Sequence, residues 1–242
     1  MPVEQPPGRQ AAITLLESGE LHVEGRLAEA SNATFLCTVG DGGLSARCVY
    51  KPVRGERPLD DFPPRTLANR ERAAYLLSEA MGWRIVPPTV LRDGPFGPGM
   101  AQLWVDADPA ADVLAMVLRP DERLRRICVF DVLANNADRK GTHLLPLPGG
   151  HVQGVDHGVC FAQAPKLRTV LWGWRGAALE QEELDAVRTV RDAVEGRLGA
   201  ELRDLLSRAE IGAIGRRAEG LLRAGRFPLP DPDRPALPWP PF

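Results

Sequence analysis

The spacing of apolar residues changes along this chain from the period of a strand to that of a helix, and this change limits the fold more than any other feature. Residues 20–51 hold short apolar runs separated by polar residues and turns, a pattern typical of β-strands. Residues 179–225 carry leucines at helical spacing, such as Leu198, Leu202 and Leu205. Strands first and helices later predict an α+β fold with a strand-rich N-terminal lobe and a mainly helical C-terminal lobe.

The first half is expected to hold short strands and one helix. We expect strands at residues 21–25, 34–39, 46–51 and 100–105, and an apolar stretch at 89–91. The Gly-Asp-Gly-Gly run at 40–43 predicts a hairpin turn, because Asp-Gly readily adopts positive φ. No helix is expected directly after this glycine cluster, so we do not interpret it as a phosphate-binding loop. A helix is expected at 66–81, with Gly82 as its stop, and the Gly/Pro-rich stretch 93–99 is expected to be a loop.

The second half is expected to be helical around one small hairpin. Helices are predicted at residues 111–118, at 121–135 and within 179–225. Two short strands are predicted at 143–147 and 151–155, on either side of a Pro-Gly-Gly turn.

These patterns predict four segments. They are a flexible N-terminus at 1–10, a strand-rich lobe at 11–106, a helical lobe at 107–226 and a Pro-rich tail at 227–242; the resemblance described below implies that the first lobe binds nucleotide and the second is catalytic. The tail cannot be helical, because proline has no N–H donor. It is expected either to lie extended on the body, with Trp239 and Phe242 as anchors, or to be disordered.

Composition excludes several classes of protein. A formal net charge of -2 among 242 residues gives no general attraction to nucleic acid or to an anionic membrane. No apolar run approaches the ~20 residues of a membrane span, and no signal segment opens the chain. The four cysteines, without C-x-x-C spacing, are interpreted as reduced thiols of the core. We therefore expect a soluble cytoplasmic protein, and frequent Ala, Arg, Gly and Pro indicate a bacterial source.

Lys51 and Glu71 are predicted to form an ion pair. Lys51 closes an apolar strand, where a lysine is costly unless it meets an anion. Glu71 lies on the apolar face of the helix at 66–81, so it too needs a partner if it is buried. The alternative is two unrelated surface charges; the strand-then-helix order favours the pair.

A dense polar cluster separates an apolar helix from a strand at residues 135–140, Asn-Asn-Ala-Asp-Arg-Lys. Such residues could serve as a helix cap and a turn. Asp131, an acid inside the apolar helix, is expected to orient this loop. Asp156 ends the second strand of the hairpin, so Asp138 and Asp156 bracket it and are predicted to meet at one edge, where a divalent metal could be shared with ATP.

In order and spacing, these segments resemble the phosphatidylinositol 3- and 4-kinase superfamily and, more distantly, the HipA-type kinases. The resemblance covers residues 20–175. Asn136-Ala-Asp138-Arg139 is similar to the family's Asn-x-Asp-Arg catalytic loop, and Val155-Asp156-His157-Gly158 to its metal-binding Ile-Asp-Asn-Gly. The strand ending at Lys51 resembles the nucleotide-lysine strand, and the helix with Glu71 the element that supplies its partner.

Two further segments match the family by position. Ser31, Asn32, Ala33 and Thr34 occupy the place of the phosphate loop, and Gln102, Leu103, Trp104 and Val105 that of the hinge strand that receives adenine. The resemblance implies a two-lobed protein-kinase-like fold with an ATP cleft between the lobes.

The resemblance also implies roles for individual residues. Asp138 would orient or deprotonate a hydroxyl acceptor, Asp156 would chelate Mg²⁺, and Lys51 would bind the α- and β-phosphates of ATP, held by Glu71. Arg139 would either assist at the γ-phosphate or form a structural ion pair. The activity implied is ATP-dependent phosphotransfer to a protein, lipid or small-molecule hydroxyl group, with no nucleic-acid partner and no integral membrane association.

One departure leaves an alternative open. His143 stands where the family usually has an asparagine ligand of Mg²⁺, and imidazole suits Mg²⁺ less well than oxygen does. Either fewer protein ligands hold the metal, or Mn²⁺ replaces it, or activity is weak. The alternative hypothesis is a nucleotide-binding pseudokinase or scaffold.

Overall fold

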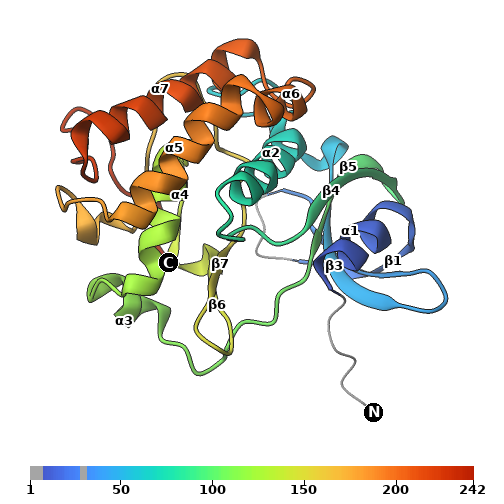
Figure 1. The fold of residues 1–242 in the computed structure, drawn as a ribbon. Coiled ribbons are helices and arrows are strands. Elements are labelled where there is room, and N and C mark those ends of the chain that lie inside the picture. The colour runs from blue at the N-terminus through green and yellow to red at the C-terminus, as the bar shows by residue number, and fades with distance from the viewer. Residues whose placement is uncertain (1–7, 28–31) are drawn as a thin grey trace. The chain divides into compact units, whose positions relative to one another are not determined.

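The computed structural model describes residues 8–27 and 32–242, which form two compact units (Figure 1). The first unit comprises Met1–Arg72 and Pro87–Val105, and the second comprises Ala73–Val86 and Asp106–Phe242. The first is strand-rich and the second mainly helical, as the sequence predicts.

A five-stranded antiparallel sheet forms the first unit, with the strand order β1-β2-β3-β5-β4. Its strands are β1 (Glu20–Arg26), β2 (Phe35–Gly40), β3 (Ser45–Pro52), β4 (Thr89–Gly94) and β5 (Gly97–Leu103). The turn between β2 and β3 is the predicted one: the Asp41 carboxylate accepts the backbone N–H groups of Gly43 and Leu44, and Gly42 has a φ of +89°.

The predicted loop at 93–99 is wrong. β4 continues to Gly94 and β5 begins at Gly97, so the segment is a tight hairpin. Gly97 has a φ of +90°, which the turn needs, and Gly99 lies so close to Lys51 and Pro52 of β3 that a Cβ atom would collide with their backbone. These glycines and prolines form a tight strand pair rather than a loop.

Helix α1 (Arg9–Ser18) is not among the predicted elements. It begins within the segment expected to be flexible, residues 1–10, so that expectation is wrong for Arg9 and Gln10; residues 1–7 lie outside the described part. Leu15 and Leu16 of α1 pack with Val39 and Tyr50 of the sheet in one buried cluster. Helix α1 is therefore stabilised by packing its apolar face on the sheet. Its apolar pattern is too short to predict a helix from the sequence alone.

Helix α2 (Leu67–Ala80) lies within the predicted helix at 66–81. The chain leaves it at Gly82, whose φ of +71° and N–H bond to the carbonyl of Glu79 agree with the predicted stop. Its first residues belong to the first unit and the remainder, from Ala73, to the second, whereas the predicted lobe at 11–106 contains the whole helix.

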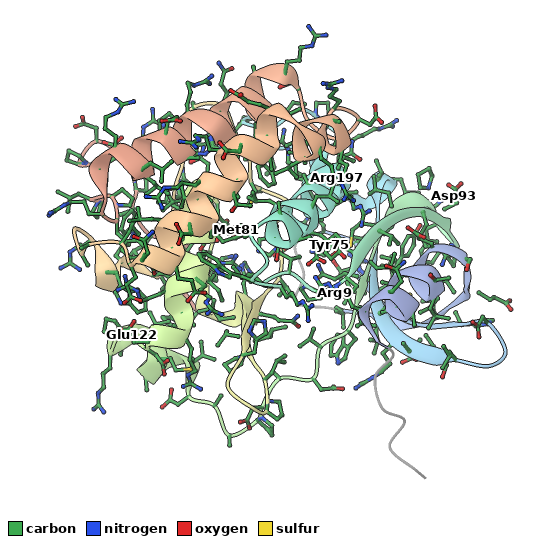
Figure 2. The ribbon with its side chains drawn as sticks, viewed as in Figure 1. Arg9, Tyr75, Met81, Asp93, Glu122 and Arg197 are labelled. Carbon is green, nitrogen blue, oxygen red and sulfur yellow. The ribbon has the colours of Figure 1, made fainter. Side chains whose placement is uncertain are left out.

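The second unit contains helices and the predicted small hairpin. Its elements are α3 (Val113–Leu118), α4 (Arg125–Ala134), β6 (Leu144–Pro146), β7 (Val152–Gly154), α5 (Gln181–Glu195), α6 (Arg197–Leu202) and α7 (Arg208–Ala224), with short 3₁₀ turns between some of them. β6 and β7 pair antiparallel, which brings the chain segments on either side of them together. Figure 2 shows Arg197 at the start of α6, where its exposed side chain pairs with Glu201 at 2.9 Å.

A bidentate ion pair joins α4 to α5. The Arg125 guanidinium donates from Nε and Nη2 to the two carboxylate oxygens of Glu183, each at 2.8 Å. Glu183 also accepts the backbone N–H of Glu180 and so caps α5. Hydrogen bonding to Glu183 raises the pKa of Arg125 above its usual value, and burial only partly opposes this.

The Pro-rich tail lies extended on the second unit, one of the two predicted alternatives. The indole N–H of Trp172 donates to the carbonyl of Ala236, and the N–H of Gly141 donates to the carbonyl of Pro241. Phe242 packs so tightly on Gly141 that a Cβ atom at 141 would overlap its ring. Phe242 is thus an anchor as expected, but Trp239 is 88% exposed and is not.

All four cysteines are free and buried, which confirms their interpretation as core thiols. Among the described residues, no helix combines the length and the apolar character needed to cross a membrane.

Candidate active site

Lys51 and Glu71 form the predicted ion pair within the first unit. The Lys51 ammonium group donates to the Glu71 carboxylate at 2.7 Å. The Glu71 side chain is 2% exposed and that of Lys51 is 20% exposed. A lysine at the end of β3 is thus fixed by an acid of α2 and still keeps part of its surface accessible.

We expect Glu71→Gln to lower the free energy of unfolding by about 1–3 kcal/mol, because it removes a charge-assisted hydrogen bond from a buried carboxylate. Urea denaturation measures this change. Glu17→Gln is the matched control, since Glu17 is exposed on α1 of the same unit. Equal stability of the two variants would contradict the assignment of Glu71 as a buried partner.

The predicted phosphate loop is only partly described, because Ser31 lies outside the described residues. The Asn32 side chain accepts the backbone N–H of Arg57 at 2.8 Å, and the buried Thr34 hydroxyl donates to the carbonyl of Asn32 at 3.3 Å. Both side chains therefore hold the local backbone, and their role at a nucleotide phosphate stays a prediction.

The predicted hinge residues follow one another at the end of β5. The Gln102 amide donates to the Thr89 hydroxyl at 2.8 Å and is buried, which makes its side chain structural. Leu103 and Trp104 bond through their backbone N–H groups to neighbouring segments, and Val105 ends the first unit. Adenine binding by these residues is also untested.

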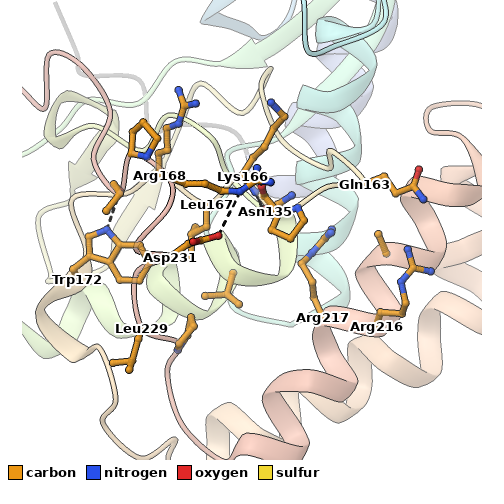
Figure 3. A pocket seen from close by; sticks show the side chains of 17 residues that line it. Asn135, Gln163, Lys166, Leu167, Arg168, Trp172, Arg216, Arg217, Leu229 and Asp231 are labelled. Carbon is orange, nitrogen blue, oxygen red and sulfur yellow. Dashed lines mark hydrogen bonds and ion pairs between the residues drawn. The ribbon is translucent and has the colours of Figure 1, made fainter.

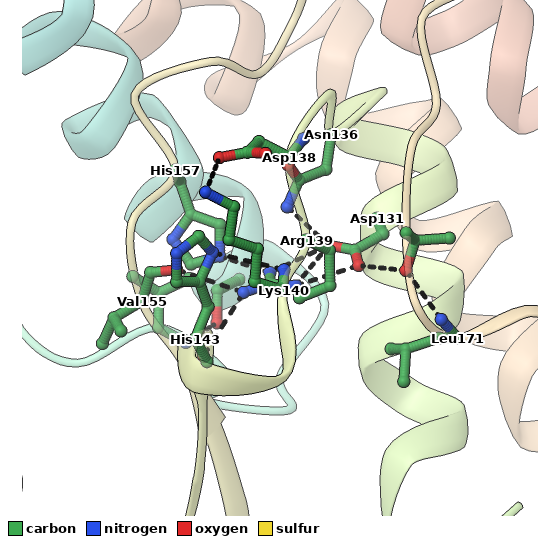
Figure 4. A network of polar contacts seen from close by, with 12 residues as sticks. Asp131, Asn136, Asp138, Arg139, Lys140, His143, Val155, His157 and Leu171 are labelled. Carbon is green, nitrogen blue, oxygen red and sulfur yellow. Dashed lines mark hydrogen bonds and ion pairs between the residues drawn. The ribbon is translucent and has the colours of Figure 1, made fainter. Parts of the chain in front are cut away.

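The catalytic-loop candidates of the second unit are built around a fully buried ion pair (Figure 4). Arg139 donates from Nη2 to Asp131 at 2.8 Å, and neither side chain has exposed surface. Burial alone would lower the pKa of Arg139, but the Asp131 carboxylate holds that pKa above its usual value. Asp131 also accepts the side-chain amide of Asn136 at 3.0 Å. It therefore orients the loop, as predicted.

Asn136, held by Asp131, in turn positions Asp138. Its side-chain oxygen accepts the backbone N–H of Asp138 at 3.0 Å, which fixes where the aspartate leaves the chain. The Asp138 carboxylate then lies 3.3 Å from the Lys140 ammonium group and is 33% exposed. Asp138 is the one acid of this loop that can meet a substrate, whereas Asp131 is enclosed.

Burial raises the pKa of Asp138, and the Asp156 carboxylate adds to that effect. Lys140 opposes both, as does Arg168. The two predicted acids thus lie close enough to influence each other, as their places on either side of β6 and β7 led us to expect. The sequence analysis assigns no role to Lys140 or Arg168; Lys140 could have been found from its place two residues after Asp138, whereas Arg168 is distant in sequence from both acids.

Asp156 has a positive φ of 60°, which is uncommon for a residue other than glycine. Its carboxylate lies 3.4 Å from Nε2 of His143, and its side chain is 49% exposed. His143 itself is largely covered. His143 therefore contacts the acid predicted to bind metal, and its own role as a ligand stays a prediction.

Oxygen donors of the kind that Mg²⁺ prefers are present at the predicted site, where Mg²⁺ binding stays a prediction. Among the described residues, no group of three His, Cys, Asp or Glu side chains could hold a metal ion. Mg²⁺ is commonly held by one or two carboxylates together with substrate phosphates, and Asp138 and Asp156 can supply those carboxylates.

Arg139 is not placed to reach a phosphate, so its predicted catalytic role is corrected. Its guanidinium is committed to Asp131, to the carbonyls of His143 and Val155, and to His157. Of the two roles considered, the structural ion pair agrees with this burial. Arg139 is a positioning residue that joins the loop to both ends of the hairpin.

Comparison with known proteins identifies a close relative in Mycobacterium tuberculosis. Protein Rv2133c of Mycobacterium tuberculosis is 47% identical, and the match covers 94% of both chains. No protein-family model matches the chain.

Two plant proteins are similar over part of the chain. Phosphatidylinositol 4-kinase gamma 2 of Arabidopsis thaliana is 27% identical over 57% of the chain, and phosphatidylinositol 4-kinase gamma 4 of Oryza sativa is 26% identical over 67%. The match covers 34% of each plant protein, so the chain spans about a third of their length.

A solved structure shares the fold. The proinflammatory kinase CtkA of Helicobacter pylori superposes with a TM-score of 0.53 over 88% of this chain and 94% of that one, at 11% identity. The predicted kinase-like α+β fold is thereby confirmed. The more distant HipA resemblance stays a prediction.

Proposed function

We propose that this chain, which belongs to the same family as Protein Rv2133c of Mycobacterium tuberculosis, is an ATP-dependent phosphotransferase that transfers the γ-phosphate to a hydroxyl acceptor. A kinase-like fold and the similarity to two plant phosphatidylinositol 4-kinases support the class of reaction. The observation that carries the proposal is Asp138, a half-buried acid fixed by Asn136 and influenced by the second acid, Asp156.

In this proposal the acceptor hydroxyl gives its proton to Asp138 while its oxygen forms a bond to the γ-phosphorus. The bond from the γ-phosphorus to the bridging oxygen of ADP breaks, and ADP leaves with that electron pair. Asp156, together with the nucleotide phosphates, would hold Mg²⁺, or Mn²⁺ in its place, which when bound supplies positive charge to the phosphate oxygens. Lys51 would contribute a further cation, fixed by Glu71.

The alternative of a nucleotide-binding pseudokinase rests on His143. An imidazole 3.4 Å from Asp156 stands where an oxygen donor is expected, and imidazole is a softer ligand than Mg²⁺ prefers. A pseudokinase would bind ATP without turning it over.

We expect the native chain to release ADP and to phosphorylate itself or an added acceptor when ATP and Mg²⁺ or Mn²⁺ are present. Asp156→Asn is expected to lower turnover by about a hundredfold or more, because it removes a negative charge from the metal site. Turnover is measured with labelled ATP, and binding by the shift in melting temperature. A native chain that is stabilised by ATP but as inert as the variant would overturn the kinase proposal in favour of the pseudokinase.

The class of acceptor can be tested separately from the reaction. Labelled ATP added to a cell extract, with Asp156→Asn as the blank, would reveal an acceptor of any class. We infer a bacterial, cytoplasmic enzyme without nucleic-acid partners, on the basis of the composition and net charge of -2.

A further inference from the structure

A cavity of about 480 Å³ lies within the second unit, and neither Asp138 nor Asp156 is among the residues that line it (Figure 3). The end of α4, the segment 163–168, α7 and the tail residues 228–236 enclose it. Figure 3 shows Arg216 and Arg217 extending from α7 on one side of the cavity and Trp172 on the other. Its volume is within the range of sites that bind small molecules, about 300–1,000 Å³.

The lining of this cavity is strongly basic. Five of the residues that line it carry a positive charge, and one carries a carboxylate. The basic residues are Lys166, Arg168, Arg216, Arg217 and Arg234, and the acid is Asp231. Asp231 lies 3.4 Å from Nε of Arg234, so the one acid of the lining is already paired with one of the bases. Among the residues that line the cavity, no acid other than Asp231 is therefore present to balance Arg216 and Arg217.

The Arg217 guanidinium is only partly satisfied by hydrogen bonds. Its Nε donates to the carbonyl of Leu133 at 2.8 Å and its Nη1 to that of Ala162 at 3.4 Å. Its Nη2 atom is buried and meets no hydrogen-bond acceptor within residues 8–27 and 32–242. Burial lowers the pKa of Arg217 to about 10, and the neighbouring Arg216 acts in the same direction. A guanidinium in this position is costly unless an anion compensates it.

The walls of the cavity are held in place independently of any ligand. The Asn135 amide donates to the carbonyls of Ala162 and Ala164, and its oxygen accepts the backbone N–H of Lys166. Arg234 ties the tail to this segment by donating to the carbonyl of Pro165 at 2.7 Å. The basic groups therefore start from fixed elements, which reduces the entropy lost when a ligand binds.

We propose that this cavity is a binding site for a small, multiply charged oxyanion, a phosphate group either free or carried as an ester, which lies against Arg216 and Arg217. Guanidinium groups suit phosphate because their donors match its oxygens in pairs. The site goes beyond the proposed phosphotransfer, because Asp138, Asp156 and Lys51 do not line the cavity.

The test is a calorimetric titration of the full chain with inorganic pyrophosphate in the presence of EDTA. A parallel titration with glycerol 3-phosphate distinguishes an ester from the free ion. We expect Arg216→Gln to weaken binding by about tenfold, the effect of one lost charge-assisted hydrogen bond. Arg217→Gln is expected to weaken it at least as much. Arg217 also donates to two backbone carbonyls, so Arg217→Gln could fail to fold. In that case Arg216→Gln decides the test, because Arg216 is at an exposed position of α7.

Two controls separate this site from others. Arg223→Gln makes the same charge change at another exposed position of α7 that does not line the cavity, and should leave the affinity unchanged. Lys51→Ala impairs the proposed nucleotide site and should also leave it unchanged. The proposal is overturned if neither probe binds the native chain, if Arg223→Gln weakens binding as much as Arg216→Gln, or if only Lys51→Ala abolishes it. None of these results depends on kinase activity.

Discussion

Replacing Asp138 with asparagine is expected to lower phosphotransfer turnover by about a thousandfold while ATP still binds. The variant keeps the size of the side chain and leaves the backbone bond to Asn136 in place, but an amide cannot take the proton of the acceptor hydroxyl. Loss of a general base typically costs about 10²–10⁴ in rate. Labelled-ATP turnover measures the loss, and the melting-temperature shift with ATP measures binding.

The pH profile gives a second readout for the same residue. Because the pKa of Asp138 is raised above its ordinary value of 3.8, the acid limb of turnover should lie above that pH, with activity lost as pH falls through the raised pKa. Burial makes ionisation of Asp138 costly in the folded state, so this group disfavours folding above its raised pKa. Asp138→Asn should therefore not destabilise the chain at neutral pH.

Asp185→Asn, an exposed change on α5, is the matched control and should have full turnover. If Asp138→Asn retained more than about a tenth of the native rate, the carboxylate would not be the base. Turnover that falls together with the melting temperature would instead indicate lost folding.

The sequence predicted the residues whose burial is chemically costly better than those whose burial depends on long-range packing. Lys51 and Glu71 were paired correctly because each needs a counter-charge in an apolar element, and the structure places them 2.7 Å apart. Asp131 was correctly given an orienting role for the same reason.

The wrong or missing predictions concern residues whose burial depends on contacts with segments distant in sequence. Helix α1 is stabilised by contact with strands distant in sequence, so its short periodic run gave little signal. Trp239 was expected to be an anchor on the basis of its size, but Phe242 is the residue that finds a complementary surface, at Gly141. The charge of the cavity beside α7 is equally invisible, because its basic residues come from three separate segments.

Asp131→Asn is expected to lower the free energy of unfolding by about 3–5 kcal/mol, the cost of removing one partner from a buried ion pair. Arg139 would keep its charge in a site with no exposed surface and lose the carboxylate that it contacts at 2.8 Å. Urea denaturation measures the loss, with Asp185→Asn as the surface control.

The double variant Asp131→Asn/Arg139→Met tests whether the uncompensated charge is the cause. Removing the cation as well should restore part of the stability lost by Asp131→Asn alone, because an apolar side chain of similar length leaves no buried charge. Turnover should stay low in the double variant, since Arg139 joins the loop that carries Asp138 to the carbonyls of His143 and Val155. Stability regained without activity is the combination expected of a positioning pair. A single variant destabilised by less than about 1 kcal/mol would contradict the buried pair itself.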